Sequence, residues 1–310
     1  MEDTSYGNVS RGIDDWLELH RDEWFRREDI WAHFGLNKLQ EGTQWKKYVA
    51  VKLNNEVKAG ILEKNNTKFR IIDTTLDEIN WMEAKDKKPI EIRYPLGLES
   101  FVKTYPQSII TVAAPPGWGK SAYLFNVALC NMDFPHGVYI WSHDLSDVEI
   151  WERIEQSGFE IPNPPPFKIY ERMGNFKDVV GLYPDALHII DYLSLDADRL
   201  YMVDRELKGI SEKLKGGVAF VGLQKHPNAK LPYGGTFAEM KPKLTLVIET
   251  KVEYGNKFNI LRIHKCRGRQ DPDFDPVGME FKFKIRRGIR LERLDEPEDE
   301  AEIQEKAEIE

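Results

Sequence analysis

Residues 108–121 read SIITVAAPPGWGKS, and they hold the most informative pattern in the sequence. The first part, SIITV, is an apolar and β-branched run that predicts a buried strand. The residues that follow the stretch, AYLFNVALCNM, predict a helix. A glycine-bearing loop between a strand and a helix N-terminus can hold phosphate oxygens, because backbone N–H groups and the positive helix end converge there. The sequence therefore predicts a phosphate-binding loop.

The loop fits the pattern GxxxxGK(S/T), except that its first position is Ala114 instead of glycine. In such a loop Lys120 reaches the β- and γ-phosphates of ATP, and Ser121 ligates Mg²⁺. The alternative is a chance Gly-Lys-Ser in a surface loop, and the flanking strand and helix argue against it. The residues predicted to contact ATP are Ala114, Pro115, Pro116, Gly117, Trp118, Gly119, Lys120 and Ser121.

Further apolar runs of strand length lie between about residues 90 and 290, separated by segments long enough for helices. They are GVYIWS (137–142), LHIID (187–191), GVAFVGL (217–223), LTLVIE (244–249) and FNILRIH (258–264). Strands that alternate with helices predict an α/β domain with a mostly parallel sheet and flanking helices.

One of these runs, at 187–191, ends in an aspartate. In a parallel sheet the Asp191 carboxylate then lies at the edge that carries the phosphate loop, where it can hold Mg²⁺ through a water molecule. An aspartate at the end of a strand can also be a helix cap. Taken with the loop, Asp191 and Ser121 form the predicted magnesium site.

Five ordered motifs between about residues 95 and 288 resemble the RecA-like motor of DnaB-type hexameric replicative helicases. That family often has alanine first and proline in the middle of its phosphate loop, as here. The sequence DYL at 191–193 is similar to the Asp-Tyr-Leu of the family, and SHDLS at 142–146 stands where the family has Ser-Leu-Glu-Met-Ser. The resemblance implies a RecA-like P-loop NTPase fold. It also implies that Asp144, one methylene shorter than glutamate, polarises the attacking water.

The last two motifs lie after the runs GVAFVGL and FNILRIH. Gln224 matches the polar residue with which the family senses the γ-phosphate. Lys265 and Arg267 resemble a Lys-x-Arg pair that reaches the nucleotide of the neighbouring subunit and stabilises charge on its γ-phosphate. The alternative for this pair is a solvated strand end. The resemblance implies ATP hydrolysis between the subunits of a homo-oligomeric ring, most simply a hexamer.

The segment 225–243, KHPNAKLPYGGTFAEMKPK, contains glycine, proline and lysine. In the related motors this region holds a loop that faces the central channel and binds single-stranded DNA. Lys225, Lys230 and Lys241 are the residues expected to contact DNA phosphates. An ordinary surface loop with scattered lysines is the alternative.

The N-terminal segment has the element order of a small winged-helix (α+β) domain. Two amphipathic helices are expected around residues 13–17 and 30–34. A third is expected from Gln44 to about Ala59, capped by Thr43 and ended by Gly60. A hairpin with its turn at residues 65–66 follows.

Charge in the N-terminal segment favours contact with nucleic acid. Residues 43–70 carry seven bases and two acids, a net charge of +5. At ~100° per residue, Lys47, Asn54 and Lys58 lie on the side of the third helix opposite its apolar residues. Together with Lys68 and Arg70 of the hairpin, they are the predicted contacts to duplex DNA. Winged helices also dock proteins or form oligomers, which is the alternative.

The excess of acidic over basic residues in the sequence lies in its C-terminal segment. The 310 residues carry a formal net charge of −8, and residues 291–310, with ten acids and two bases, carry all of it. The net charge therefore does not exclude a nucleic-acid partner. We expect this segment to be a disordered tail, which either only solubilises the chain, competes with DNA for basic surfaces, or docks a replication or recombination protein.

The composition of the sequence limits the class of protein and its location further. A hydrophobic content of 41% is enough for a packed core. No apolar run approaches the ~18 residues of a membrane span, and the first residues lack a signal-peptide pattern, so no membrane partner is expected. Two cysteines far apart in the sequence favour a reducing compartment, and we predict a cytoplasmic location.

These observations predict a winged-helix domain at 1–82, a charged linker at 83–94, a RecA-like ATPase domain at 95–290 and an acidic tail at 291–310. The predicted function is an ATP- and Mg²⁺-dependent DNA helicase or translocase in DNA replication. Two alternatives stay open: a RecA-like recombinase or loader without unwinding activity, and an ATP-gated DNA-binding regulator.

Overall fold

The computed structural model describes residues 6–294, apart from residues 22, 39–41, 75, 77, 80, 87, 195 and 196. The chain divides into two compact units, Met1–Asp86 and Lys87–Glu310. Most of the predicted acidic tail, from residue 295 on, lies outside the described residues. None of the helices in the described part of the chain has the length and apolar composition needed to cross a membrane.

The first unit, in its described residues, consists of three α-helices, a small antiparallel sheet and a 3-10 helix at Trp81–Asp86. Its elements are α1 (Tyr6–Leu19), β1 (Phe25–Arg26), α2 (Arg27–His33), α3 (Gly42–Lys58), β2 (Leu62–Asn65) and β3 (Lys68–Ile71). The strands lie in the order β1-β3-β2. Ile13, Ile30, Leu53 and Phe69 bring the helices and the hairpin into one small core.

Two local expectations for this unit are corrected. Helix α3 begins at Gly42, so Thr43 lies inside its first turn and not at the cap. The hairpin turn is formed by residues 66–67, because Asn65 still pairs with Lys68. Asn66 has a φ of 53°, a left-handed conformation that asparagine tolerates better than most residues.

In its described residues, the second unit is built on a nine-stranded sheet in the order β12-β11-β10-β9-β4-β8-β7-β5-β6. The strands from β9 to β6 run parallel, and β10, β11 and β12 add an antiparallel edge. Their bounds are β4 (Ile109–Ala114), β5 (Val138–Ser142), β6 (Phe167–Glu171), β7 (Leu187–Asp191), β8 (Val218–Gln224), β9 (Leu244–Glu253), β10 (Asn256–Cys266), β11 (Glu280–Arg286) and β12 (Arg290–Arg293). The predicted α/β class with a mostly parallel sheet is confirmed, and β12 includes the first residues of the predicted tail.

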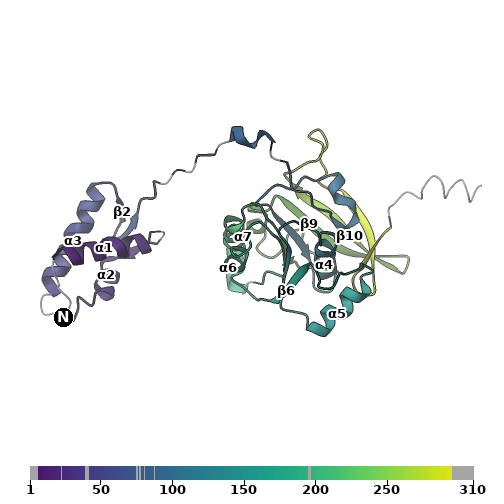
Figure 1. Cartoon of the computed structure of the whole chain (residues 1–310), viewed down its shortest axis with the longest axis horizontal. Helices are drawn as coiled ribbons and strands as arrows, with labels where there is room; N and C mark the ends of the chain where they lie inside the picture. The colour runs from purple at the N-terminus through teal and green to yellow at the C-terminus, as the bar shows by residue number, and fades with distance from the viewer. Residues whose placement is uncertain are drawn as a thin grey trace, which may run out of the picture. The chain divides into compact units, whose positions relative to one another are not determined.

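Helices cover both faces of this sheet (Figure 1). They are α4 (Lys120–Cys130), α5 (Asp147–Gln156), α6 (Phe176–Val180), α7 (Val203–Lys213) and α8 (Phe237–Met240). Alternate residues of β4 belong to two cores, since successive side chains of a strand point to opposite faces. Ile110 and Val112 pack in the core that contains α4, and Ile109 and Ala113 pack in the core that contains α6 and α7.

A histidine is buried inside the parallel sheet. His188 of β7 has no exposed surface, its Nε2 donates to the carbonyl oxygen of Tyr183 at 2.9 Å, and its Nδ1 accepts from the indole of Trp141 at 3.2 Å. Burial lowers the pKa of His188 from 6.5 to about 4. The folded protein therefore holds this imidazole in its neutral form.

We expect this histidine to make the protein sensitive to acid. Because the pKa of His188 is lower in the folded state, the stabilisation is complete above pH 6.5 and is lost as the pH falls from 6.5 to about 4. This shift corresponds to about 3 kcal/mol of unfolding free energy. Urea unfolding across that pH range measures it. A His188→Gln variant, which cannot titrate, should have a shallower pH dependence; an equal slope would contradict the assignment.

Candidate active site

The loop between β4 and α4 has the backbone that the phosphate-binding pattern requires. Gly117 and Gly119 have φ values of 76° and 97°, in the left-handed region that favours glycine. A Cβ at Gly119 would lie 2.3 Å from Cδ1 of Ile285 in β11, so a larger residue there would have to displace the Ile285 side chain. The loop residues from Ala114 to Gly119 lead directly into α4, whose first residues are Lys120 and Ser121.

Lys120, the first residue of α4, and Asp191, the last residue of β7, form a buried ion pair next to this loop. The distance from Nζ to Oδ1 is 2.8 Å, and the two side chains are 8% and 1% exposed. The Lys120 Nζ also lies 4.2 Å from the ring centre of Tyr192. The other carboxylate oxygen of Asp191 is buried and has no hydrogen-bond partner among the residues that the structure describes. A buried carboxylate oxygen left free beside the Ser121 end of the helix fits a hydrated Mg²⁺.

Three more polar residues reach this edge from neighbouring strands. Asp144 follows β5 with a side chain that is 53% exposed, and Gln224 ends β8. Tyr192 follows β7 and hydrogen-bonds the side chain of Gln224. Burial, together with the negative charge of Asp144, raises the pKa of the Tyr192 phenol, so this hydroxyl stays protonated at neutral pH. The structure thus brings Asp144, Gln224, Lys120 and Asp191 to one place.

The cavity over the loop has a volume of about 640 Å³ and two unlike sides. Asp144, Tyr192 and Gln224 line one side. The other is formed by the β10–β11 hairpin, where the amide of Asn259 donates to the carbonyl oxygen of Trp118 at 2.9 Å. Residues that the sequence analysis missed line the cavity as well: Arg153, Lys257, Asn259, Lys284, Ile285 and Arg286.

A larger cleft, of about 1110 Å³, lies at the opposite edge of the sheet. It is lined by the segment 88–93 and by residues that precede the parallel strands, including Pro135, Asp185 and Gly216. Neither the phosphate loop nor the Lys120–Asp191 pair contributes to it. The smaller cavity is therefore the better candidate for nucleotide chemistry.

Lys265 and Arg267 also lie at that opposite edge. Strand β10 is antiparallel to β9, and Cys266 pairs with Leu244, the first residue of β9. The Lys265 ammonium contacts the carbonyl oxygen of Glu239, and burial, with the positive charge of Arg267, lowers the pKa of Lys265. Arg267 is exposed. The structure does not bring this pair to the phosphate loop of its own chain.

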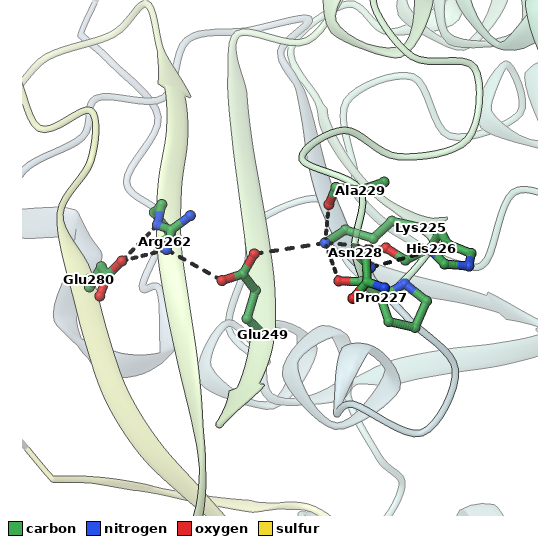
Figure 2. A network of polar contacts seen from close by, with 8 residues as sticks. All are labelled: Lys225, His226, Pro227, Asn228, Ala229, Glu249, Arg262 and Glu280. Atoms are coloured by element: carbon green, nitrogen blue, oxygen red, sulfur yellow. Dashed lines mark hydrogen bonds and ion pairs between the residues drawn. The ribbon is translucent and has the colours of Figure 1, made fainter. Parts of the chain in front are cut away.

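Lys225 is placed differently from the prediction. It has no exposed surface, and its ammonium donates to the carbonyl oxygens of His226, Pro227 and Ala229. Figure 2 shows that the network continues through Glu249, at 3.8 Å from the ammonium, to Arg262 and Glu280. The prediction that Lys225 contacts DNA phosphates is therefore wrong: the residue holds the turn at 226–229 against β9.

Removing this buried ammonium should loosen the turn. We expect Lys225→Met to lower the unfolding free energy by about 1–3 kcal/mol, because three carbonyl groups lose their donor. The segment 226–236 should then be cut faster in limited proteolysis. Lys230→Met, which removes an exposed lysine of the same segment, is the matched control and should leave both readouts unchanged. Equal behaviour of the two variants would contradict this role of Lys225.

The other predicted DNA contacts differ in accessibility. Lys230 is exposed and Lys241 is half-buried. In the first unit Lys47, Asn54 and Lys58 are exposed along α3, and Lys68 is exposed on β3. Arg70 is paired with Glu63 at 2.7 Å, so its guanidinium is partly engaged within the unit.

Among solved structures, the KaiC-like protein of the hyperthermophilic archaeon Pyrococcus horikoshii is similar to this chain, with a TM-score of 0.53 and 12% sequence identity. The likeness covers 67% of this chain and 99% of the other. It shows a RecA-like fold, in agreement with the mostly parallel sheet that carries the phosphate loop after β4. No protein-family model matches the sequence, and no curated protein is significantly similar to it.

Proposed function

We propose that this protein is an ATP-dependent DNA helicase or translocase of the DnaB type, which hydrolyses ATP between the subunits of a ring and binds single-stranded DNA. The observation that carries the proposal is the buried Lys120–Asp191 pair at the phosphate loop, in which one Asp191 oxygen has no partner within the described part of the chain. Such a pair keeps the groups for phosphate and for a hydrated magnesium ion in place before nucleotide binds.

In the proposed complex the ATP phosphates lie at the N-terminus of α4, where loop N–H groups and Lys120 meet their charge. Ser121 and Asp191 would hold a magnesium ion, whose positive charge would offset the negative charge of the phosphates. Asp144, Tyr192 and Gln224 come from strands on one side of β4, so the γ-phosphate points to them. The base then lies toward the β10–β11 hairpin.

Hydrolysis is a single displacement at the γ-phosphorus. A water oxygen forms a bond to phosphorus, the bond to the β–γ bridging oxygen breaks, and ADP keeps the electron pair. Asp144 orients this water and takes its proton. Gln224 hydrogen-bonds the γ-phosphate. Because Gln224 also hydrogen-bonds Tyr192, the position of the Tyr192 side chain changes with the presence of the γ-phosphate.

The position of Lys265 and Arg267 favours a site completed by a second copy. The pair lies at the sheet edge opposite its own loop, so an action on the γ-phosphate has to be on the nucleotide of a neighbour. A head-to-tail contact of this kind repeats from copy to copy and closes into a ring when the rotation allows it. We assign the ring six subunits by the family resemblance.

We assign DNA contacts to both units. The segment 226–242 begins two residues after the proposed sensor Gln224 and carries the exposed Lys230, so it is our candidate for binding single-stranded DNA. The first unit has the element order of a winged helix, with the basic side of α3 exposed. We propose that it binds duplex DNA or a partner protein.

The proposal is tested by ATP turnover with and without single-stranded DNA, native mass, and unwinding of a forked duplex. We expect single-stranded DNA to raise ATP turnover about tenfold or more. We also expect ATP-dependent unwinding of the forked duplex by a species whose native mass is that of the assembled ring. DNA-stimulated turnover with strand exchange and no unwinding would instead identify a recombinase or loader. Slow, DNA-independent turnover with sequence-specific duplex binding would identify a regulator.

A further inference from the structure

His143 precedes the proposed catalytic residue Asp144 in the sequence, and the two side chains are in contact. The His143 side chain is 8% exposed, and its Nε2 is 3.4 Å from Oδ1 of Asp144. The imidazole ring is 5.0 Å from the ring of Tyr192, and its buried Nδ1 has no hydrogen-bond partner in the part of the chain that the structure describes. The ring is therefore held by packing, and its polar contact inside the chain is directed at Asp144.

Asp144 needs such a contact if it is to act as a base. Its carboxylate is 53% exposed and is carried by a single methylene on the segment between β5 and α5. The start of α5 is fixed separately, because Ser146 and Glu149 form a capping box. An exposed carboxylate that rotates freely spends little time in the orientation needed to take a proton from water. A donor that fixes one carboxylate oxygen removes this freedom.

We propose that His143 is a positioning residue for the hydrolytic reaction. When nucleotide binds, we expect the 3.4 Å contact to shorten into a hydrogen bond in which Nε2–H of the imidazole donates to Oδ1 of Asp144 and leaves Oδ2 to the attacking water. The water oxygen bonds to the γ-phosphorus, ADP leaves with the electron pair, and the water proton goes to Oδ2 of Asp144. With His143 as its support, the shorter side chain of Asp144 can thus take the proton from the attacking water, a role that the longer side chain of glutamate could fill without support. The inference rests on the proposed ATP hydrolysis.

The inference is tested with variants of residues 143 and 144, by measuring kcat and KM for ATP and the affinity for a fluorescent ATP analogue. His143→Leu should lower kcat about tenfold to a hundredfold while nucleotide affinity stays the same. His143→Gln keeps an N–H donor near the carboxylate and should retain most of the activity. The double variant His143→Leu with Asp144→Glu should recover activity, because the longer side chain reaches the water without help.

Asp144→Asn separates failure of this inference from failure of the proposed function. If wild type does not hydrolyse ATP, the proposed function fails. If wild type is active and Asp144→Asn turns over normally, the role of Asp144 and with it the positioning role of His143 are overturned, while the proposed ATP hydrolysis stands. If Asp144→Asn is inactive but His143→Leu has wild-type kcat, the positioning role of His143 is overturned. It is also overturned if His143→Leu and His143→Gln both lose nucleotide affinity, because the histidine then only supports the local fold.

Discussion

Replacing Lys120 by alanine is expected to lower ATP turnover by about a thousandfold or more and to abolish detectable ATP binding. The Lys120 ammonium is the buried cation at the phosphate loop, 2.8 Å from Asp191, and no other residue of the loop carries a positive charge. The variant also leaves the Asp191 carboxylate buried without its cation, so we expect a loss of stability as well. Phosphate release and equilibrium binding of a labelled ATP analogue measure the effect.

Two controls belong to this experiment. Lys168→Ala removes an exposed lysine on β6 and should leave turnover unchanged. Thermal unfolding of both variants shows whether Lys120→Ala is still folded at the assay temperature. A folded Lys120→Ala protein with wild-type binding and turnover would show that nucleotide does not use this loop.

Replacing Arg267 by alanine is expected to lower kcat by about a thousandfold with nucleotide binding unchanged, the effect of losing a cation supplied by a neighbouring subunit. Arg267 is exposed at the sheet edge opposite the phosphate loop, so its loss leaves the ATP contacts of its own chain intact. Arg269→Ala is the matched control, because Arg269 is paired with Asp275 at 2.7 Å within the chain.

Mixing two inactive variants gives a sharper result. In an equimolar mixture of Lys120→Ala and Arg267→Ala chains, about a quarter of the head-to-tail contacts combine an intact loop with an intact Arg267. We therefore expect turnover to reappear on mixing, although each variant alone is inactive. An Arg267→Ala protein with wild-type kcat, or a mixture that stays inactive while the chains co-assemble, would contradict a shared site.

The parallel part of the fold could be predicted from the sequence because its strands are buried on both faces. Five of the six apolar runs became the parallel strands β4, β5, β7, β8 and β9, and the sixth, 258–264, became the antiparallel strand β10. Strands β6, β11 and β12 were missed. β6 lies at the edge of the sheet and buries few of its residues, and β11 and β12 alternate apolar residues with lysine and arginine, so neither forms an apolar run.

The sequence could place those residues of the candidate site that lie next to the end of a parallel strand. The loop, Asp144, Asp191 and Gln224 stand next to strand ends, and parallel strands bring such ends to one edge. Lys284 and Arg286 line the cavity because β11 pairs with β10. This pairing cannot be predicted from the local sequence pattern of either strand. Lys225 was misassigned because its burial depends on Glu249 and on carbonyl groups in its own turn.

Release of phosphate from ATP by the wild-type protein, measured with and without single-stranded DNA in samples of known native mass, tests the central claim most directly. We expect magnesium-dependent turnover that rises about tenfold or more with DNA and that belongs to the assembled species rather than to the monomer. An assembled, DNA-bound protein that releases no phosphate above the rate of the Lys120→Ala variant would contradict the account.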